Sequence, residues 1–461
     1  MNKKLCVFIA VCLVLCMIPS VGMMFFPTTQ STENKAMAEA PKLLMEDGKF
    51  NTFILQDCGE YFADHIALRN QMIFADAKIQ TSLFSESNVS GVIYGENDWL
   101  YYSSTLDDYL GRAPMSERDL FNLSHNLAVV QEYLDKRKID FVFTVPPNKN
   151  TLYDENMPYY HNSKLEFEHN AVRLEEYLAE QKVNYISLFD LFEEQDEVLY
   201  LKRDSHWNMK GACLAYNSIM DTLSIKHEDY SKTAPVVENT ANGDLNKMLY
   251  SFYGETEENY NYNLTQKYKY SNDVKGVEDG WIITENKEGK GTLLMFRDSF
   301  ADTLIPFMSN EFETAYYSKG QPNAMERYIE EDTPACVVVE KVERNISDYL
   351  DTPPIITPPV AELTSNILIT KTDSDVSVEP CMYDGEYYVV SGSIDEQRID
   401  TRSEIVVCVN DVMYRAYHTG ENDFSLYLKK SAFVNNSADI QVYVINGDDS
   451  VRVLSEIIDL Q

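Results

Sequence analysis

The stretch Thr292–Phe300 reads TLLMFRDSF and joins an uninterrupted apolar run to a polar triplet. Its first five residues carry no charge and are typical of a strand that is buried on both faces of a parallel sheet. A helix is expected over 300–309. Ser299 is therefore predicted at the carboxyl end of a strand and at the start of a helix, which is the edge where open α/β sheets bind ligands.

Strand-like and helix-like segments alternate on both the N-terminal and the C-terminal side of this stretch. The strand-like runs are 139–145 (IDFVFTV), 183–187 and 335–341 (ACVVVEK), and helices are expected over 116–138, 164–181 and 208–224. Strands that alternate with helices predict the α/β class, with a parallel sheet covered by helices on both faces, over residues 86–350.

The pattern changes at residues 351–360, where DTPPIITPPV predicts a Pro-rich linker. Beyond it, short alternating runs are separated by turn residues and show no helical period. This pattern predicts a C-terminal β-sandwich over 361–461, for which carbohydrate binding is one role that the sequence leaves open.

The N-terminal part begins with an apolar run over 5–26, which is long enough to cross a bilayer. Lys3 and Lys4 are expected to hold the leading end in the cytoplasm. The segment 1–26 is either a cleaved signal peptide or a retained anchor. The anchor is favoured, because the small-residue sites over 36–40 lie well beyond the apolar run. Residues 27–85 are expected to form a stalk and a helical arm, and the remainder to work outside the cytoplasm.

The charge balance argues against nucleic acid, because 74 acidic residues stand against 39 basic ones and give a formal charge of -35. Aromatic residues make up 12% of the chain, which suits polar ligands such as glycans. The eight cysteines include no CxxC pair, so no metal site is expected. A disulfide such as Cys381 with Cys408 is compatible with the sequence.

Two short motifs carry the chemistry that nucleophilic catalysis needs. A serine nucleophile requires an imidazole to remove its proton and a carboxylate to orient the imidazole. Ser299 and the motif Asp204-Ser205-His206-Trp207 supply these three groups. The alternatives are a helix-capping role for Ser299, and a metal pair or a loop-capping histidine in the second motif.

A third motif, Pro146-Pro147-Asn148-Lys149, follows the run 139–145 and is predicted at the same sheet edge as Ser299. It either contributes to a pocket there or forms a Pro-shaped loop with a solvated lysine.

Five segments of the chain resemble, in the same order, motifs of the alginate O-acetylation proteins of the AlgJ and AlgX type and of the related DHHW proteins. They are 64–69 (DHIALR), 92–101 (VIYGENDWLY, with Asp98 where Gly is usual), 147–149 with Tyr153 and Pro158, 204–208 (DSHWN) with Gly211 and Ala212, and 297–300 (RDSF). The resemblance covers roughly residues 40–345, and the ordered set is more specific than any single segment.

The resemblance implies an SGNH-hydrolase-like fold in which Ser299 is the nucleophile and His206 and Asp204 complete the triad. Asp298 is expected to be structural. Lys149, Tyr101 and Arg344 are the residues expected to bind substrate. The resemblance also implies O-acetylation of a cell-surface or secreted polysaccharide, in a bacterial envelope.

A protein that works outside the cytoplasm needs a source of acetyl groups other than coenzyme A. No Gly-rich phosphate loop for coenzyme A is evident, and no cofactor is expected. The resemblance implies a membrane-bound O-acyltransferase partner that delivers acetyl across the bilayer. Two other functions remain open: an acetylesterase with the same triad, and a non-catalytic glycan-binding scaffold.

Overall fold

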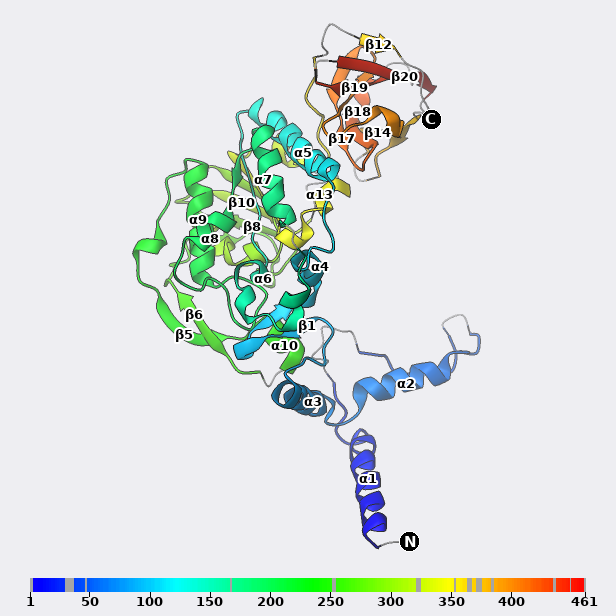
Figure 1. Cartoon of the computed structure of the whole chain (residues 1–461), viewed down its shortest axis with the longest axis vertical. Helices are drawn as coiled ribbons and strands as arrows, with labels where there is room; N and C mark the ends of the chain where they lie inside the picture. Colours follow the sequence, from blue (N-terminus) through cyan, green and yellow to red (C-terminus); the bar gives the residue numbers. More distant parts are fainter. Residues whose placement is uncertain are drawn as a thin grey trace.

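The computed structural model describes residues 3–29, 37–45, 48–165, 168–250, 254–320, 325–351, 354–362, 367–369, 375–382, 385–433, 437–447 and 449–459. Figure 1 shows an N-terminal helix, a helical arm, an α/β body and a separate group of strands near the C-terminus. The chain is therefore α/β with an additional all-β part, as the sequence predicts.

Within the described residues, the α/β body contains a seven-stranded sheet of order β4-β3-β11-β9-β10-β8-β7. The parallel strands are β4 (Tyr185–Ile186), β3 (Asp140–Thr144), β11 (Cys336–Glu340), β9 (Thr292–Phe296) and β10 (Thr314–Ser318). The strands β8 (Trp281–Glu285) and β7 (Lys269–Tyr270) extend the sheet in antiparallel fashion. The sheet is thus mixed, and the predicted strands at 139–145, 292–296 and 335–341 form three neighbours at its centre.

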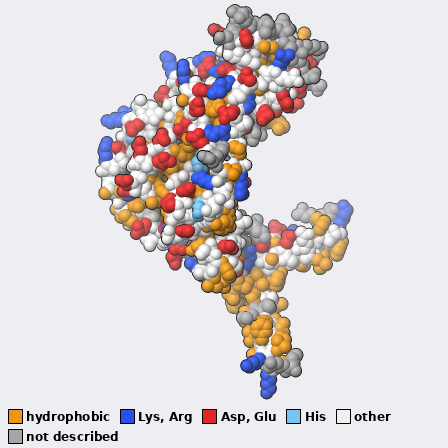
Figure 2. Space-filling model, viewed as in Figure 1, with side chains coloured by type: hydrophobic (Ala, Val, Ile, Leu, Met, Phe, Trp, Pro, Cys, Tyr) orange, Lys and Arg blue, Asp and Glu red, His pale blue; other side chains and the backbone are white. Residues whose placement is uncertain are grey.

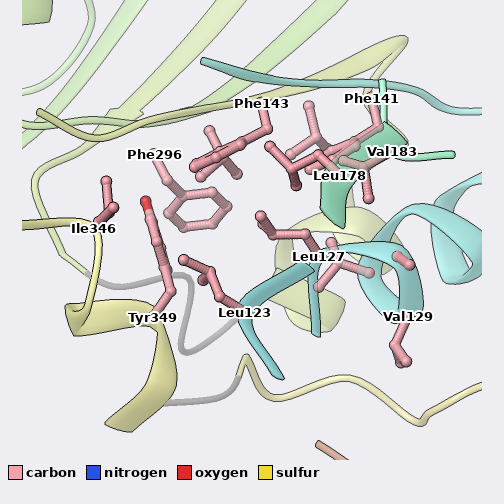
Figure 3. Packing of buried hydrophobic residues seen from close by; sticks show 14 of the residues in the cluster. Leu123, Leu127, Val129, Phe141, Phe143, Leu178, Val183, Phe296, Ile346 and Tyr349 are labelled. Carbon is pink, nitrogen blue, oxygen red and sulfur yellow. The ribbon is translucent and has the colours of Figure 1, made fainter. Parts of the chain in front are cut away.

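The two faces of the sheet are buried in two separate hydrophobic clusters, because alternate residues of each strand point in opposite directions. On β3, Phe141 and Phe143 pack into one cluster and Val142 into the other. On β9, Leu294 and Phe296 alternate with Leu293 and Met295 in the same way. Figure 3 shows part of the first cluster, in which Leu123 and Leu127 lie near Phe143 and Phe296.

Helices cover both clusters. The first is covered by α5 (Glu117–Asp135), α7 (Asn170–Glu180), α12 (Met325–Asp332) and α13 (Asp348–Asp351); the second by α8 (Leu188–Glu193), α9 (Met209–Thr222), the 3-10 helix η7 (Phe300–Thr303) and α11 (Ile305–Ser309). Ser116 caps α5 as predicted, in a capping box with Asp119. The helix predicted over 164–181 begins only at Asn170, and the one predicted over 300–309 consists of η7 and α11.

The C-terminal strands form two sheets. One has the order β12-β20-β19-β15-β16, with β12 (Ile367–Ile369), β20 (Asp449–Asp459), β19 (Ser437–Asn446), β15 (Glu404–Val409) and β16 (Val412–Arg415). The other has the order β13-β14-β18-β17, with β13 (Asp375–Pro380), β14 (Tyr387–Ser393), β18 (Asp423–Lys429) and β17 (Tyr417–His418). Side chains from both sheets share one buried cluster, which is the arrangement of a β-sandwich.

The disulfide that the sequence allows between Cys381 and Cys408 is absent. Cys381 and Cys408 are both free and buried in different hydrophobic clusters, so they form no disulfide. The first of the short alternating runs expected after the linker, 366–372, lies largely outside the described residues, which include only β12 there.

The sandwich packs on α5 through buried polar contacts. The Asn126 side chain donates to the carbonyl of His418 at 2.9 Å and accepts from its backbone N–H at 2.9 Å. The His125 and His418 rings stack with centroids 4.2 Å apart. Figure 1 shows β17 beside α5, and these contacts join the two parts of the molecule.

The N-terminal part contains three helices: α1 (Lys3–Gly22), α2 (Ile54–His65) and α3 (Arg69–Phe84). By length and composition, α1 is the one helix among the described residues that is long and apolar enough to cross a membrane. Its exposed apolar surface is visible in Figure 2. The helical arm predicted within 27–85 is broken at Leu68, which has a φ of 63°.

Shorter elements lie between the arm and the central sheet. They are β1 (Val92–Tyr94), β2 (Leu100–Tyr102), α4 (Leu106–Tyr109), α6 (Lys149–Leu152), β5 (Val236–Ala241), α10 (Asp244–Tyr250) and β6 (Glu257–Asn261). The β1–β2 turn holds Asn97 and Asp98 at positive φ, the conformation for which glycine is favoured. Asp98 is tolerated there and accepts a hydrogen bond from Tyr94 Oη at 2.5 Å.

Candidate active site

Three loops meet at the carboxyl edge of the central sheet, because β3, β11 and β9 are parallel neighbours. Ser299 lies in the segment after β9, Arg344 in a 3-10 helix after β11, and Lys149 at the start of α6 after β3. This is the edge at which the sequence places a ligand site.

The structure brings the three predicted triad residues together. His206 Nε2 lies 2.8 Å from Ser299 Oγ, and His206 Nδ1 lies 2.6 Å from Asp204 Oδ1. With the ring proton on Nδ1, His206 donates to Asp204 and accepts from the serine hydroxyl. Ser299 and His206 are partly exposed residues.

Ser299 has no helix-capping role, because its side chain makes no cap hydrogen bond to η7. Asp298 holds the loop instead: it accepts from the backbone N–H of Phe300 at 2.9 Å and of Val342 at 2.8 Å. The Asp298 N–H in turn donates to Glu340 at 2.9 Å. These bonds fix the loop after β9 against the end of β11 and leave the Ser299 hydroxyl for His206.

The histidine loop is held by its own backbone and by the helix that follows it. Leu201 donates its N–H to the His206 carbonyl at 3.2 Å. The indole of Trp207 donates to Thr303 Oγ1 at 2.7 Å, and this bond ties the loop to η7. Asn208 caps α9, since its side chain accepts from the N–H groups of Lys210 and Gly211.

The charges at the triad stabilise the charged form of each partner. Burial disfavours an imidazolium at His206, but the hydrogen bond and the negative charge of Asp204 outweigh it and raise the pKa of His206 above its usual value. Burial also opposes ionisation of Asp204, yet its hydrogen bond to His206 and the charge of that ring hold the pKa of Asp204 well below its usual range. The pair is therefore arranged to accept and hold a proton on the ring.

Asp244, on α10, is a site residue that the sequence analysis missed. It accepts from the N–H and the hydroxyl of Ser205 at 2.7 and 2.5 Å, and its own N–H donates to Asp204 Oδ2 at 2.9 Å. Burial and the nearby charge of Asp204 raise the pKa of Asp244. No motif points to Asp244, because it lies in the polar stretch 239–290.

Lys149 has a structural position, contrary to its predicted role in substrate binding. Its side chain is 4% exposed. Its ammonium group donates to the carbonyls of Leu201, Lys202 and Asp204 at 3.1, 3.1 and 2.5 Å. The three N–H bonds of the ammonium are thus used, and Lys149 holds the histidine loop instead of a substrate. Burial lowers the pKa of Lys149 to about 8.

Tyr101 and Arg344, the other residues predicted to bind substrate, line one small pocket together with Lys149. Tyr101 is fully buried and its hydroxyl donates to the carbonyl of Tyr153 at 2.5 Å. Arg344 is partly exposed and donates to Asn148 Oδ1 at 3.3 Å. Of the three, Arg344 alone presents a polar group that a reactant can reach.

Two groups of side chains in the described residues bring possible metal ligands within 4.8 Å of one another: Asp204, His206 and Asp244, and Asp108, His169 and Glu343. In the first, both ring nitrogens of His206 are engaged, by Asp204 and Ser299, so the geometry is that of a proton relay. In the second, Glu343 accepts from the N–H of Asn148 at 2.6 Å and from Thr151 at 2.8 Å.

One protein family matches part of the chain. Residues 92–288 match the family of the SGNH hydrolase-like domain of acetyltransferase AlgX, a stretch that includes Asp204 and His206 and ends before Ser299. No curated protein sequence matches the chain.

Solved structures give a more distant likeness. PatB1 of Bacillus cereus is 16% identical with a TM-score of 0.44, over 55% of this chain and 96% of that protein. The O-acetyltransferase domain of Pseudomonas putida AlgJ is 16% identical with a TM-score of 0.38, over 56% and 92%. A DHHW family protein of Eubacterium siraeum is 13% identical with a TM-score of 0.41, over 56% and 93%. The family match itself confirms the predicted resemblance: residues 92–288 are similar to the SGNH hydrolase-like domain of acetyltransferase AlgX.

Proposed function

We propose that this chain is an extracytoplasmic O-acetyltransferase that transfers acetyl groups to a cell-surface or secreted polysaccharide through an acyl-enzyme on Ser299. The observation that carries the proposal is the continuous hydrogen-bonded relay from Asp204 through His206 to the Ser299 hydroxyl. The acetyltransferase type of the matched domain supports acetyl as the group that is moved.

The relay supports a two-step reaction. Ser299 Oγ attacks the acetyl carbonyl while His206 Nε2 takes the hydroxyl proton, and the ring then returns that proton to the leaving group of the donor. In the second step, His206 removes a proton from a sugar hydroxyl, which attacks the serine ester and releases Ser299. Asp204 stabilises the imidazolium in both steps, and the Ser299 N–H contributes to the oxyanion site.

The donor is proposed to be a membrane-bound O-acyltransferase, because acetyl must be supplied outside the cytoplasm. The length and composition of α1 support a membrane anchor, which would hold the catalytic domain near such a partner and raise its effective concentration. We propose in addition that the acceptor is a polysaccharide. The segment 351–360 would link the catalytic domain to the sandwich over 361–461, which would bind carbohydrate.

The test compares the wild-type protein with Ser299→Ala and His206→Ala in two assays. The first is release of p-nitrophenol from p-nitrophenyl acetate by purified protein, and the second is base-releasable acetate on the surface polysaccharide of cells. Both are expected to fall by several orders of magnitude or to background in each variant. If the wild-type protein released p-nitrophenol but cells with the active gene carried less polysaccharide acetate than cells with Ser299→Ala, the protein would be an esterase. Unchanged polysaccharide acetate in Ser299→Ala would instead favour a scaffold.

A further inference from the structure

Asn150 is buried beside the candidate active site with its polar atoms unused. Its side chain is 1% exposed. Neither the amide nitrogen nor the amide oxygen has a hydrogen-bond partner within the described part of the chain. Most buried amides in proteins are hydrogen-bonded, because an unpaired donor or acceptor loses its bonds to water without replacement. The position of Asn150 is therefore unfavourable for folding and calls for a ligand.

Asn150 lines a small pocket next to the triad. Asn150 lines it together with Ser205, which lies between Asp204 and His206 in the chain, and with Arg344. The Arg344 guanidinium lies 5.7 Å from the ring centroid of Phe300, the residue after Ser299. One wall of the pocket is thus the residue before the histidine, and another wall, Arg344, contacts the residue after the serine.

The pocket is small and has a solvent side. Its volume is about 10 Å³, which is roughly the room that one water molecule or one hydroxyl group needs. Tyr102 and Arg344 line it and are partly exposed, whereas Thr105 and Ser205 are buried. A chain lying over Tyr102 and Arg344 would therefore insert a single small group toward Asn150.

The two unpaired atoms identify the chemistry of that group. An amide nitrogen donates and an amide oxygen accepts, so a carbonyl or an oxyanion would satisfy only the nitrogen, and an ammonium only the oxygen. A hydroxyl donates and accepts, and satisfies both. Polysaccharides present hydroxyl groups on adjacent carbons, one of which can enter the pocket while its neighbour faces the serine ester.

We propose that this pocket is the acceptor subsite, in which the Asn150 amide binds one sugar hydroxyl and thereby orients the neighbouring hydroxyl for acetylation. The inference rests on the proposed function and adds to it a residue that recognises the acceptor. The first step, acylation of Ser299 by the donor, does not use this subsite. Loss of the Asn150 amide should therefore slow transfer to the sugar and leave acylation of Ser299 unchanged.

The test uses Asn150→Leu, which fills a similar volume without polar atoms, and Asn150→Ala. Both purified variants are expected to release p-nitrophenol from p-nitrophenyl acetate within about threefold of wild type. In cells, base-releasable acetate on the surface polysaccharide is expected to fall about 10- to 100-fold, the range for a lost hydrogen bond in a buried site. Thermal unfolding is expected at the same or a higher temperature in Asn150→Leu, because an unpaired amide has been removed.

Asn170→Leu is the matched control, because Asn170 is also buried but its amide is paired. Asn170 donates to the Ala113 carbonyl at 2.9 Å and accepts from the Met115 N–H at 2.8 Å. This variant is expected to unfold at a lower temperature.

Two results would contradict the proposed subsite, and a third would contradict the proposed function on which it rests. An equal loss of p-nitrophenol release and polysaccharide acetate in Asn150→Leu would overturn it, because the amide would then serve the acetyl group. No change in either assay would also overturn it and leave a bound water as the occupant. If wild type and Ser299→Ala were alike in both assays, the proposed function itself would fail, whatever Asn150→Leu did.

Discussion

His206 makes two hydrogen bonds at once, from Nδ1 to Asp204 and from Nε2 to Ser299. The ring must be neutral to accept the serine proton. Since Asp204 raises the pKa of His206 above 6.5, acylation is expected to slow as the pH falls through that raised pKa and to reach a plateau above it. The raised pKa also makes the folding free energy depend on pH. The contribution of the protonated His206 ring to stability is complete below pH 6.5 and is lost as the pH rises through the raised pKa.

Asp204→Asn tests this dependence. The variant is expected to move the acid limb of the rate profile to lower pH, because the charge that raises the pKa of His206 is gone. The acylation rate at the high-pH plateau is expected to fall by roughly 10³- to 10⁴-fold in this variant. The reason is that the His206 ring loses both its orientation and the stabilisation of its charged form. A pH–rate profile with p-nitrophenyl acetate measures both, and an acid limb that stayed in place would show that Asp204 does not set the pKa.

Lys149 gives a second prediction at this scale. Lys149→Met removes the ammonium that joins three carbonyls of the histidine loop and is expected to lower the free energy of unfolding by on the order of 2–3 kcal/mol. Release of p-nitrophenol should fall at least about tenfold. Lys210→Met is the control, since Lys210 pairs with exposed Glu197, and should change stability by less than about 0.5 kcal/mol. Equal effects of the two changes on unfolding in urea would contradict the assigned position.

What the sequence reveals of the site depends on how each residue works. Ser299, His206 and Asp204 were predictable because the reaction needs those side chains and sheet topology brings their loops together. Asn150 and Asp244 could not be predicted. Nothing in the sequence distinguishes Asp244 from the other acidic residues, of which there are 74 with Asp204 and Asp244 included, and nothing shows that the amide of Asn150 is buried. Lys149 was assigned to substrate because its motif follows a strand at the same sheet edge as Ser299. Its burial could not be foreseen, because it depends on contacts from the distant histidine loop.

At the scale of elements, helix α5 joins the central sheet to the sandwich and begins with a capping box. Ser116→Ala removes the side-chain acceptor for the Asp119 N–H and is expected to lower the free energy of unfolding by about 1 kcal/mol. Thermal or urea unfolding measures the change. Ser163→Ala, at an exposed serine outside such a cap, is expected to leave stability unchanged; a comparable loss in both variants would refute the capping effect.

The central strands were predicted to within one or two residues, because a run buried on both faces is apolar throughout. The antiparallel strand β8 was missed, since it lies in a polar stretch and only some of its residues are buried. The helix break at Leu68 was also missed, because periodic apolar spacing continues on both sides of a single residue at positive φ.

At the scale of the whole molecule, the sandwich and the α/β body meet at two buried, neutral histidines. Burial holds the pKa values of His125 and His418 well below their usual range, and the neighbouring guanidinium groups of Arg415 and Arg118 lower them further. Glu132 opposes this effect at His125. His418 Nδ1 donates to Asn122 Oδ1 at 2.9 Å, and His418 Nε2 accepts from the Ile405 N–H at 3.2 Å.

Because both pKa values are depressed, this interface is expected to stabilise the protein above pH 6.5 and to lose stability as the pH falls below it. The slope is about 1.4 kcal/mol per pH unit for each imidazole. Thermal unfolding between pH 7.5 and 5 measures the loss, and His418→Gln should show a smaller pH dependence than wild type. A transition temperature that did not change with pH in this range would contradict this account of the interface.

The most direct test of the central claim is peptide mapping by mass spectrometry after brief incubation of the whole protein with p-nitrophenyl acetate at high concentration and acid quenching. We predict acetyl on the peptide that contains Ser299, attached to that serine, and its absence from Ser299→Ala and His206→Ala. Acetyl on another residue at the same level in all three proteins, or none on Ser299 while p-nitrophenol is released, would contradict the account.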